Sequence, residues 1–365
     1  MKNRNLFLSL FFLFVFDAVA VNSTVFILIT LISFSIYIIQ RYFKFPASKK
    51  RIAVLGNNDT GKKLATYFQK NKRSFILKGH YEDLAAIHTF KAEDQIDEVY
   101  STIFPEEAEE ILPLISFAEQ HCVRLKYVTS FSKYKHEKEI FTHLNYNLNR
   151  YCEGFPILVT RQEPLSSTFN RIVKRGFDII FSLLVIACLL SWLLPLLSII
   201  ILLESPGSPI FSQLRSGKKN KEFWCYKFRS MRVNKKSDHV QATKCDARLT
   251  KIGAFIRKTS IDELPQFFNV LMGDMSVVGP RPHMLRHTEQ YRLIIEQYMI
   301  RHFLKPGITG WAQINGHRGE TKETHQMRNR VEHDLWYLEN WTLAQDFRII
   351  HKTLVNAIKG EDNAY

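Results

Sequence analysis

The stretch TSIDELPQFF, residues 259–268, places two acids side by side in a chain that is otherwise basic. Ser260-Ile-Asp-Glu263 has the spacing of a capping box, in which serine and glutamate satisfy free N–H groups at a helix start. Pro265 is tolerated only in the first helical turn. The sequence therefore predicts that the acid pair lies in or just before the first turn of the helix PQFFNVLMG, where backbone donors favour a bound phosphate.

Basic residues flank this pair on both sides. FWCYKFRSMR interleaves cations with aromatics, and strand alternation puts Lys227 and Arg229 on one face. Taken alone, this pattern also suits a solvated strand or a patch resting on anionic lipid. The nearby candidates are Asp246, Arg248 and Arg257 upstream, Arg281 between two prolines in GDMSVVGPRP, and Gln313, His317 and Arg318 in KPGITGWAQINGHR.

Two carboxylates with several arginines on stiff loops indicate Mg²⁺-assisted phosphoryl transfer. One carboxylate would attack phosphorus while the other holds the metal ion. The arginines would neutralise the remaining charge of a diphosphate.

Composition narrows the class of partner. The 365 residues include 50 Lys and Arg against 35 Asp and Glu, a formal charge of +15. Such an excess suits nucleic acid, an anionic membrane face or phosphorylated substrates. Two long apolar stretches disfavour nucleic acid. The five cysteines are scattered without a CxxC pair, which fits a reducing compartment and gives no disulfide or zinc framework.

The N-terminal apolar stretch, Leu6–Ile39, is interrupted by Asp17 and Asn22-Ser23-Thr24. A membrane span needs roughly 20 residues, so residues 1–45 form one helix with a polar kink or a hairpin of two short spans. Positive charge at both ends favours the hairpin, with both ends cytoplasmic. A cleaved signal peptide is disfavoured, because no small-residue cleavage site is followed by a polar start.

The second apolar stretch, Ile179–Leu203, carries no charge and contains Pro195. Lys174 and Arg175 precede it and further cations follow, so both flanks favour the cytoplasmic side. A kinked helix over about residues 177–203 that enters and leaves by one leaflet satisfies these facts. A straight span is the alternative, and it would place everything after residue 205 outside the cell.

Between the apolar stretches, residues 50–135 read as strand, glycine turn, helix, strand, helix and strand. This alternation predicts a small Rossmann-like, doubly wound domain, followed by a linker over 136–170. GNNDTGKK misses the phosphate-binding loop because Lys63 replaces the hydroxyl, and the dinucleotide pattern lacks its third glycine. A degenerate nucleotide fold is favoured, and we interpret the Tyr134-x-x-x-Lys138 pair as a coincidence.

Residues 171–360 resemble the bacterial sugar transferase family of monotopic polyprenyl-phosphate phosphoglycosyl transferases. The matching segments, in order, are KRGFDII, SPGSPIFSQLRSGK, YKFRSM, DARLTKIGAFIRKTSIDELPQFFNVLMGDMSVVGPRP and RHFLKPGITGWAQING. The layout of membrane segment, nucleotide-fold domain and transferase domain is similar to the large subgroup that starts exopolysaccharide or capsule repeat units, with undecaprenyl-phosphate glucose phosphotransferases as the nearest type.

The resemblance implies a reaction and its residues. A sugar 1-phosphate passes from a UDP-sugar to undecaprenyl phosphate, UMP is released, and Asp262 forms a phosphosugar-aspartyl intermediate. Glu263 would bind Mg²⁺. The resemblance implies substrate contacts from Lys227, Arg257, Arg281 and either His317 or Arg318, with Arg318 taken as the candidate. The predicted substrate-binding set also includes Arg229, Asp246, Arg248 and Gln313.

The resemblance also implies the inner membrane as location, with the catalytic domain on its cytoplasmic face. No nucleic acid partner is expected, and a homodimer is compatible with the sequence. The family's helix break often reads Ser-Pro, whereas Ser191 and Pro195 are four residues apart here. These two residues are the structural candidates for the kink, and the N-terminal anchor is shorter than is common in the subgroup.

The expected architecture is a membrane-anchored α/β protein. An N-terminal helix or hairpin precedes the Rossmann-like domain, and a mostly helical α+β catalytic domain with a re-entrant helix follows. One rival is a membrane-tethered NAD-dependent nucleotide-sugar epimerase or dehydratase, which the missing third glycine disfavours. The other is a non-catalytic assembly scaffold, which the acid pair with its arginines disfavours. The sequence does not identify the sugar.

Overall fold

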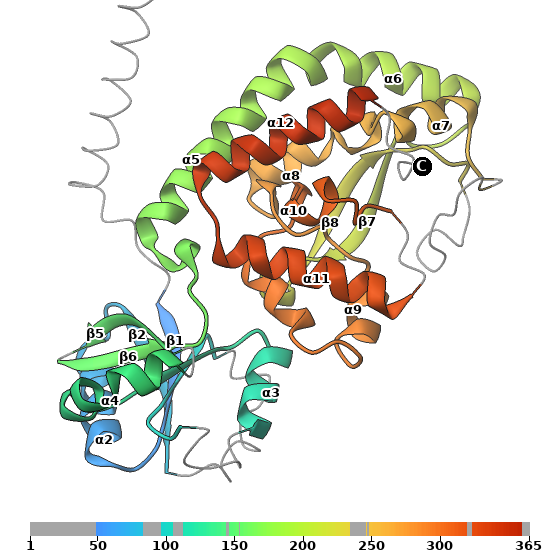
Figure 1. The fold of residues 1–365 in the computed structure, drawn as a ribbon. Coiled ribbons are helices and arrows are strands. Elements are labelled where there is room, and N and C mark those ends of the chain that lie inside the picture. Colours follow the sequence, from blue (N-terminus) through green and yellow to red (C-terminus); the bar gives the residue numbers. More distant parts are fainter. Residues whose placement is uncertain are drawn as a thin grey trace, which may run out of the picture. The chain divides into compact units, whose positions relative to one another are not determined.

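A computed structural model of the protein describes residues 49–82, 96–104, 112–143, 146–152, 154–233, 246, 248–319 and 323–359 (Figure 1). The N-terminal apolar stretch, with its predicted helix or hairpin, lies outside the described residues. The described chain is a mixture of helices and strands, and its largest sheet is mostly parallel where the Rossmann-like domain was expected.

The Rossmann-like part is a six-stranded sheet in the order β2-β1-β3-β4-β6-β5. Strands β1, β3 and β4 pair in parallel, as strands joined by crossover helices do. Its strands are β1 (Lys50–Leu55), β2 (Phe75–Tyr81), β3 (Glu98–Ser101), β4 (Arg124–Val128), β5 (Asn147–Cys152) and β6 (Phe155–Val159), and its helices are α2 (Asp59–Lys70), α3 (Leu112–Gln120) and α4 (Phe131–His143).

The Rossmann-like part continues past residue 135 through α4, β5 and β6, so the predicted linker over 136–170 is wrong up to Val159. Strands β5 and β6 form an antiparallel hairpin, and β6 pairs with β4. Ile157 and Leu158 on β6 are fully buried. Strand β5 lies at the edge of the sheet and its sequence is mostly polar, with little apolar alternation. The sequence pattern therefore did not predict this hairpin.

Two glycines bring β1 and α2 close together. Gly56 has a φ of 111°, which favours glycine. A Cβ on Gly61 would lie 2.1 Å from the Gly56 carbonyl oxygen, and the Asn58 side chain accepts a hydrogen bond from the Gly61 N–H at 2.9 Å. Both glycines therefore have a packing role in this turn.

The C-terminal part is mostly helical and contains two small two-stranded sheets. Strands β7 (Ile210–Ser216) and β8 (Glu222–Phe228) pair antiparallel, whereas β9 (Ser276–Val278) and β10 (Gly307–Thr309) pair in parallel. The helices are α5 (Thr168–Val185), α6 (Ser191–Glu204), α7 (Lys251–Lys258), α8 (Gln266–Met272), α9 (Leu285–Tyr291), α10 (Trp311–Ile314), α11 (Thr324–Glu339) and α12 (Leu343–Lys359). Single turns η4 (Pro164–Ser166), η6 (Lys218–Asn220) and η7 (Ile261–Glu263), with the longer η8 (Tyr298–Phe303), connect them.

One continuous helical run, Thr168–Glu204, is the single helix of the described chain that is long and apolar enough to cross a membrane. A π-helical segment, η5 (Ile186–Leu190), joins α5 to α6, and Pro195 lies inside α6. The Ser191 hydroxyl donates to the Ala187 carbonyl at 2.8 Å. Both π segments and prolines bend helices, and α5 and α6 follow an arc along α12 (Figure 1).

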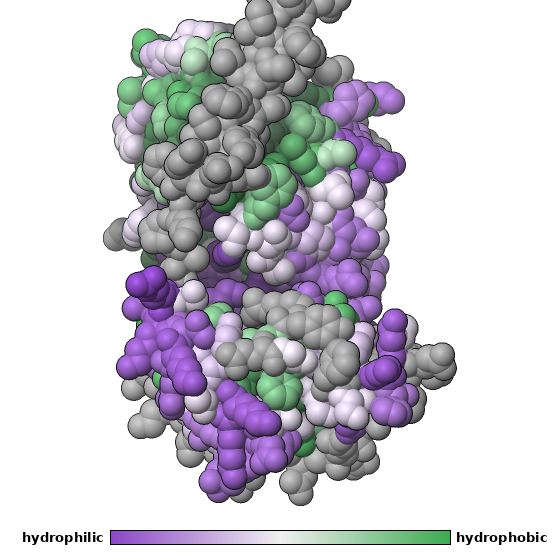
Figure 2. Space-filling model, turned by 90° about the vertical axis from the view of Figure 1, so that its left-hand side faces the viewer, coloured by the Kyte–Doolittle hydropathy of each residue, from purple (hydrophilic) through white to green (hydrophobic). Residues whose placement is uncertain are grey.

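The long helix has two unlike faces. Leu190, Leu197 and Ile201 are buried in the core of the C-terminal part. Ile180, Leu184, Trp192, Ile199 and Leu203 are exposed, with Leu203 at 83%. Hydrophobic surface gathers in the upper half of the space-filling view, where this helix lies (Figure 2). An exposed apolar face of this size marks a contact with protein or membrane.

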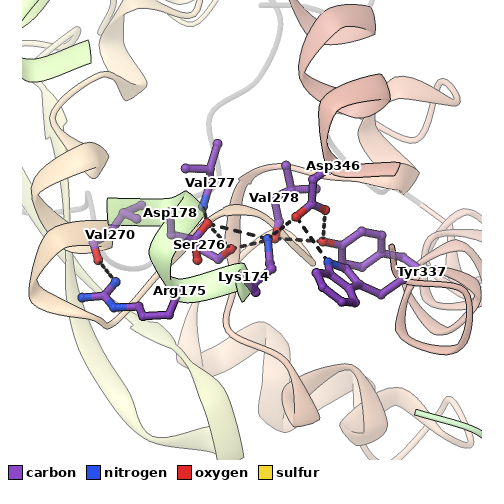
Figure 3. Close-up of polar contacts among 10 residues, drawn as sticks. Lys174, Arg175, Asp178, Val270, Ser276, Val277, Val278, Tyr337 and Asp346 are labelled. Carbon is purple, nitrogen blue, oxygen red and sulfur yellow. Dashed lines mark hydrogen bonds and ion pairs between the residues drawn. The ribbon is translucent and has the colours of Figure 1, made fainter. Parts of the chain in front are cut away.

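The charged residues that precede the apolar stretch contact the rest of the C-terminal part (Figure 3). The buried Lys174 ammonium lies 2.8 Å from Asp346 on α12 and 3.6 Å from Asp178. Arg175 donates to the carbonyls of Val270 and Leu271 and so caps the end of α8. Lys174 and Arg175, which the sequence offers as flanking charges that favour the cytoplasmic side, are both held by internal contacts.

Candidate active site

The acid pair lies in the single 3-10 turn η7, between α7 and α8, and both side chains are buried. Ser260 begins this turn with φ 59° and ψ 14°, a left-handed conformation that is uncommon outside glycine. Its side chain does not cap a helix, because an N-cap needs an extended backbone, and Pro265 takes the N-cap position of α8. The capping box is therefore wrong, whereas the predicted place of the pair just before the helix is confirmed.

Glu263 is tied to two cations from different elements. Its Oε1 lies 2.7 Å from the Lys227 ammonium and 2.7 Å from Arg281 NH2, and Arg281 NH1 reaches Oε2 at 3.3 Å. Burial alone would raise the pKa of Glu263. The charges of Arg281 and Lys227 outweigh burial and hold this pKa well below its usual range. Glu263 is therefore a fixed carboxylate anion.

Asp262 differs from its neighbour. Among the described residues its carboxylate forms no hydrogen bond or ion pair, although the side chain is only 7% exposed. Burial raises its pKa, and the adjacent Glu263 charge adds to the rise against the opposing charge of Lys227. A buried carboxylate that no donor holds is poorly stabilised as an anion and is available to react.

Arg318 completes the surroundings of the pair. Its NH2 lies 2.5 Å from the Ser260 hydroxyl, and its charge helps to lower the pKa of Glu263. His317 instead contacts His333, with ring centroids 4.4 Å apart. Of the two residues that the sequence offers, Arg318 lies beside Ser260 at the acid pair, and its role as a substrate contact stays a prediction. The charge of Arg257 acts on Asp262, and its carbonyl accepts the Ser260 N–H.

Asn269 is a contributor that sequence reasoning missed. It is fully buried on α8, where its Nδ2 donates to the Trp224 carbonyl at 2.6 Å and its Oδ1 accepts the Tyr226 N–H at 3.0 Å. These contacts fasten β8, which carries Lys227, to the helix that follows the acid pair. The available signal was a polar residue inside an apolar helical run, since a buried amide needs partners.

Other predicted residues make contacts elsewhere. The Arg229 guanidinium donates to the carbonyls of Ser205 and Pro206, and the Asp246 and Arg248 side chains form an ion pair with each other. Gln313 lies on α10, buried, and within the described chain its Oε1 has no hydrogen-bond partner. Substrate binding by these four residues stays a prediction, and for Arg229 it competes with a clear structural role.

The two carboxylates offer oxygen ligands of the kind that Mg²⁺ prefers. The described residues contain no group of three or more His, Cys, Asp or Glu side chains that could hold a metal ion. In phosphoryl-transfer sites Mg²⁺ is usually held by one or two carboxylates together with substrate phosphates and water. Within the described residues Asp262 accepts no hydrogen bond from a side chain, and Glu263 Oε2 accepts only the 3.3 Å bond from Arg281. This donor set fits an ion that arrives with a diphosphate.

Comparisons with known proteins identify related sequences. The profile of the bacterial sugar transferase family matches residues 169–360. The UDP-glucose:undecaprenyl-phosphate glucose-1-phosphate transferase of Escherichia coli (strain K12) is 50% identical over 202 residues, 55% of this chain and 43% of that protein. The Klebsiella pneumoniae protein of the same name is 38% identical over 324 residues, 84% of this chain and 67% of that protein.

A relative with another printed substrate also matches. The UDP-N-acetylgalactosamine-undecaprenyl-phosphate N-acetylgalactosaminephosphotransferase of Aeromonas hydrophila is 43% identical over 198 residues, 54% of this chain and 46% of that protein. The match thus spans less than half of the Escherichia coli and Aeromonas proteins and about two thirds of the Klebsiella protein.

Proposed function

Because the chain belongs to the bacterial sugar transferase family, we propose that it transfers a sugar 1-phosphate from a UDP-sugar to undecaprenyl phosphate and releases UMP. The product is the lipid-linked sugar that starts an exopolysaccharide or capsule repeat unit. The names of the related proteins from Escherichia coli and Klebsiella pneumoniae make UDP-glucose the first donor to test.

The main support for this proposal is that the two acids of the pair have different surroundings. Asp262 is buried and makes no polar contact in the described chain, whereas Glu263 is fixed by Lys227 and Arg281. Adjacent carboxylates with unlike surroundings take unlike roles in catalysis. Asp262 therefore serves as the nucleophile, and Glu263 organises the charges around it.

The reaction proceeds in two balanced steps. An Asp262 carboxylate oxygen attacks the β-phosphorus of the UDP-sugar, and the bond from this phosphorus to the bridging oxygen breaks, so UMP leaves with the electron pair. A phosphate oxygen of the lipid then attacks the aspartyl phosphate, and the carboxylate leaves. Two steps allow a water-soluble donor and a lipid acceptor to use one nucleophile in turn.

Cations at the site stabilise the charge that these steps move. Arg281 and Lys227 both contact the Glu263 carboxylate, and Arg318 contacts Ser260, at the start of the turn that carries the pair. Preorganised donors of this kind act strongly in a partly dry site. When bound, Mg²⁺ would neutralise charge on the diphosphate, with Glu263 as its protein ligand.

The lipid substrate requires the site to lie beside a membrane, and the long helix supplies the contact. At its start Lys174, Arg175 and Asp178 contact α12, α8 and β9, and at its end Glu204 accepts the Lys251 N–H at 2.6 Å, at the start of α7. A helix that crossed the membrane would separate its ends by about 30 Å of hydrocarbon. Contacts from both ends to one folded part support a re-entrant helix at the cytoplasmic face of the inner membrane.

The test is an assay of the full chain in nanodiscs with Mg²⁺, undecaprenyl phosphate and UDP-glucose, UDP-galactose or UDP-N-acetylgalactosamine. We expect one donor to give UMP, and Asp262→Asn to give none. Asp59→Asn changes an exposed carboxylate on α2 and should leave UMP release unchanged. Release of UDP would contradict the proposal by indicating ordinary glycosyl transfer, and no nucleotide from any donor would favour a scaffold.

A further inference from the structure

Two buried arginines lie behind the loops that carry Arg281 and Arg318. Arg301, on η8, is 2% exposed, and Arg330, on α11, is 5% exposed. Burying a guanidinium is costly unless it is paired. Asp334 on α11 supplies one carboxylate for the two, at 2.8 Å from Arg301 NH2. The mechanism does not use these three residues, so their burial needs another explanation.

Arg301 fixes the loop that carries Arg281. Its NH2 donates to the Arg281 carbonyl oxygen at 2.7 Å, and its NH1 lies 2.8 Å from Nδ1 of His283. Burial, with the nearby Arg301 charge, lowers the pKa of His283 well below its usual range, so this imidazole is neutral and accepts the bond. One guanidinium thus holds the loop at Arg281 and again two residues further on.

Arg330 fixes the second loop in the same way. Its NH2 donates to the Gly319 carbonyl oxygen at 2.9 Å, directly after Arg318, whose side chain contacts Ser260. Burial, with the charges of Arg301 and Arg281, lowers the pKa of Arg330 to about 10. Arg330 therefore remains a cation at neutral pH.

Helix α11 contributes Arg330 and Asp334 to this cluster of buried charges. Arg330, Asp334 and Tyr337 are spaced i, i+4 and i+7, which places them on one face of the helix. The Tyr337 hydroxyl donates to Asp346 at 2.6 Å and lies 3.2 Å from the Val278 carbonyl oxygen, at the end of β9 and three residues before Arg281 (Figure 3). One buried helical face therefore contacts β9 and the Gly319 loop directly, and the Arg281 loop through Asp334 and Arg301.

We propose that Arg301, Arg330 and Asp334 are positioning residues that hold Arg281 and Arg318 in place for a nucleoside diphosphate. This inference rests on the proposed function for the identity of the ligand. The two guanidiniums outnumber their one carboxylate, so the cluster also adds positive charge behind the site. We expect Arg301 to contribute more to this positioning than Arg330, because Arg301 holds the loop of Arg281, whose side chain binds Glu263 directly.

The test is a double-mutant cycle on UDP binding, measured by isothermal titration calorimetry with the full chain in detergent and Mg²⁺. A lysine at 301 keeps the charge but cannot donate to Arg281, His283 and Asp334 in fixed directions. We expect Arg301→Lys to weaken UDP binding by roughly 10-fold or more, because a displaced binding group loses most of its contribution. Since Arg301 acts through Arg281, the double variant with Arg281→Lys should bind UDP no more weakly than Arg281→Lys alone.

A matched control separates positioning from a general loss of an arginine ion pair. Arg51 in the Rossmann-like part pairs with Asp97, and Arg51→Lys should leave UDP affinity unchanged. If Arg301→Lys does not fold, Asp334→Asn, which keeps the shape of the side chain, replaces it in the cycle. We expect the same non-additivity with Arg281→Lys from this variant.

The inference would be overturned if the losses of UDP affinity in the cycle were additive, or if Arg301→Lys left the affinity unchanged. It would also be overturned if the wild-type protein bound no UDP. Binding of UDP does not require transfer of a sugar. A wild-type protein that binds UDP but releases no UMP would therefore defeat the proposed function alone, and the cycle would still decide the positioning role.

Discussion

Two adjacent carboxylates, Asp262 and Glu263, differ through their contacts more than through their burial. Both are nearly inaccessible, at 7% and 6% exposure, yet only Glu263 has cations within hydrogen-bonding distance. Their pKa values therefore move in opposite directions, up for Asp262 because of burial and down for Glu263 because Arg281 and Lys227 outweigh burial. Because the fold does not stabilise the Asp262 carboxylate, its burial should lower the free energy of unfolding.

Neutralising each acid should have opposite effects on the free energy of unfolding. Asp262→Asn removes a buried charge without a hydrogen-bonded partner, and we expect it to stabilise the protein by about 1 kcal/mol. Glu263→Gln leaves Lys227 and Arg281 without their anion, and we expect a loss of about 3 kcal/mol. Thermal unfolding of both variants in detergent measures the difference. Destabilisation by Asp262→Asn would contradict the assignment of unlike surroundings.

The stabilisation by Asp262→Asn should also depend on pH. A carboxyl group whose pKa is raised on folding holds its proton more tightly in the folded state. The wild-type protein therefore loses stability as the pH rises above the ordinary aspartate pKa of 3.8 and through the raised value. The asparagine variant lacks this loss, so its advantage in melting temperature should be larger at about pH 8 than at about pH 4.5. An advantage independent of pH would argue against a raised pKa.

Individual site residues could be predicted where their backbone setting is stiff. Arg281 stands between two prolines, and Lys227 lies between Tyr226 and the buried Phe228 on β8, so both could be expected to face one site. Arg229 could not be excluded, because its partners are the carbonyls of Ser205 and Pro206, and a pattern of side chains does not reveal backbone acceptors. The left-handed backbone of Ser260 could not be predicted either, because it follows from the turn and not from the residue type.

Among the elements, α5 shows how charges beside an apolar stretch can belong to the fold. Lys174, Arg175 and Asp178 reach α12, α8 and β9, and Asp178 accepts the Val277 N–H at 3.0 Å (Figure 3). Charge beside an apolar segment predicts topology from sequence, yet here the exposed cation on that flank is Arg171. The strand and helix order of the Rossmann-like part was predictable from apolar periodicity, whereas the edge hairpin β5–β6 was not.

Removing the ammonium of Lys174 should destabilise the C-terminal part. Lys174→Met leaves Asp346 and Asp178 buried without their common cation, and we expect a loss of about 3 kcal/mol in the free energy of unfolding. Arg171→Met, three residues earlier on the exposed side of α5, should change it by less than about 0.5 kcal/mol. Thermal unfolding in detergent compares the two. Equal effects would mean that the buried ion pairs add nothing beyond surface charge.

At the scale of the whole molecule, the long helix is the element through which the proposed re-entrant arrangement would place the site beside the membrane. One of its faces packs into the C-terminal core and the other exposes large apolar side chains. Its two ends contact the same folded part through Lys174 and Glu204. Sequence could supply the length and apolar character of this helix, but not the long-range contacts that return its end to α7.

Cysteine labelling in cells tests the re-entrant arrangement. Ser167→Cys precedes the helix and Ser208→Cys follows it, in a background without native cysteines. We expect a membrane-impermeant maleimide to label neither position in intact spheroplasts and both after permeabilisation. Labelling of Ser208→Cys from outside intact spheroplasts would indicate a straight span and would place the site on the wrong side for UDP-sugars.

Intact-protein mass spectrometry can detect directly whether Asp262 becomes covalently attached to the sugar phosphate, as we propose. The full chain would be incubated with Mg²⁺ and the UDP-sugar that gives UMP, without lipid acceptor, and quenched in acid. We expect a mass increase equal to one sugar phosphate, which is absent from Asp262→Asn and lost when undecaprenyl phosphate is added. UMP release that occurs only with the lipid present, without any mass increase, would contradict it and indicate direct attack by the lipid phosphate.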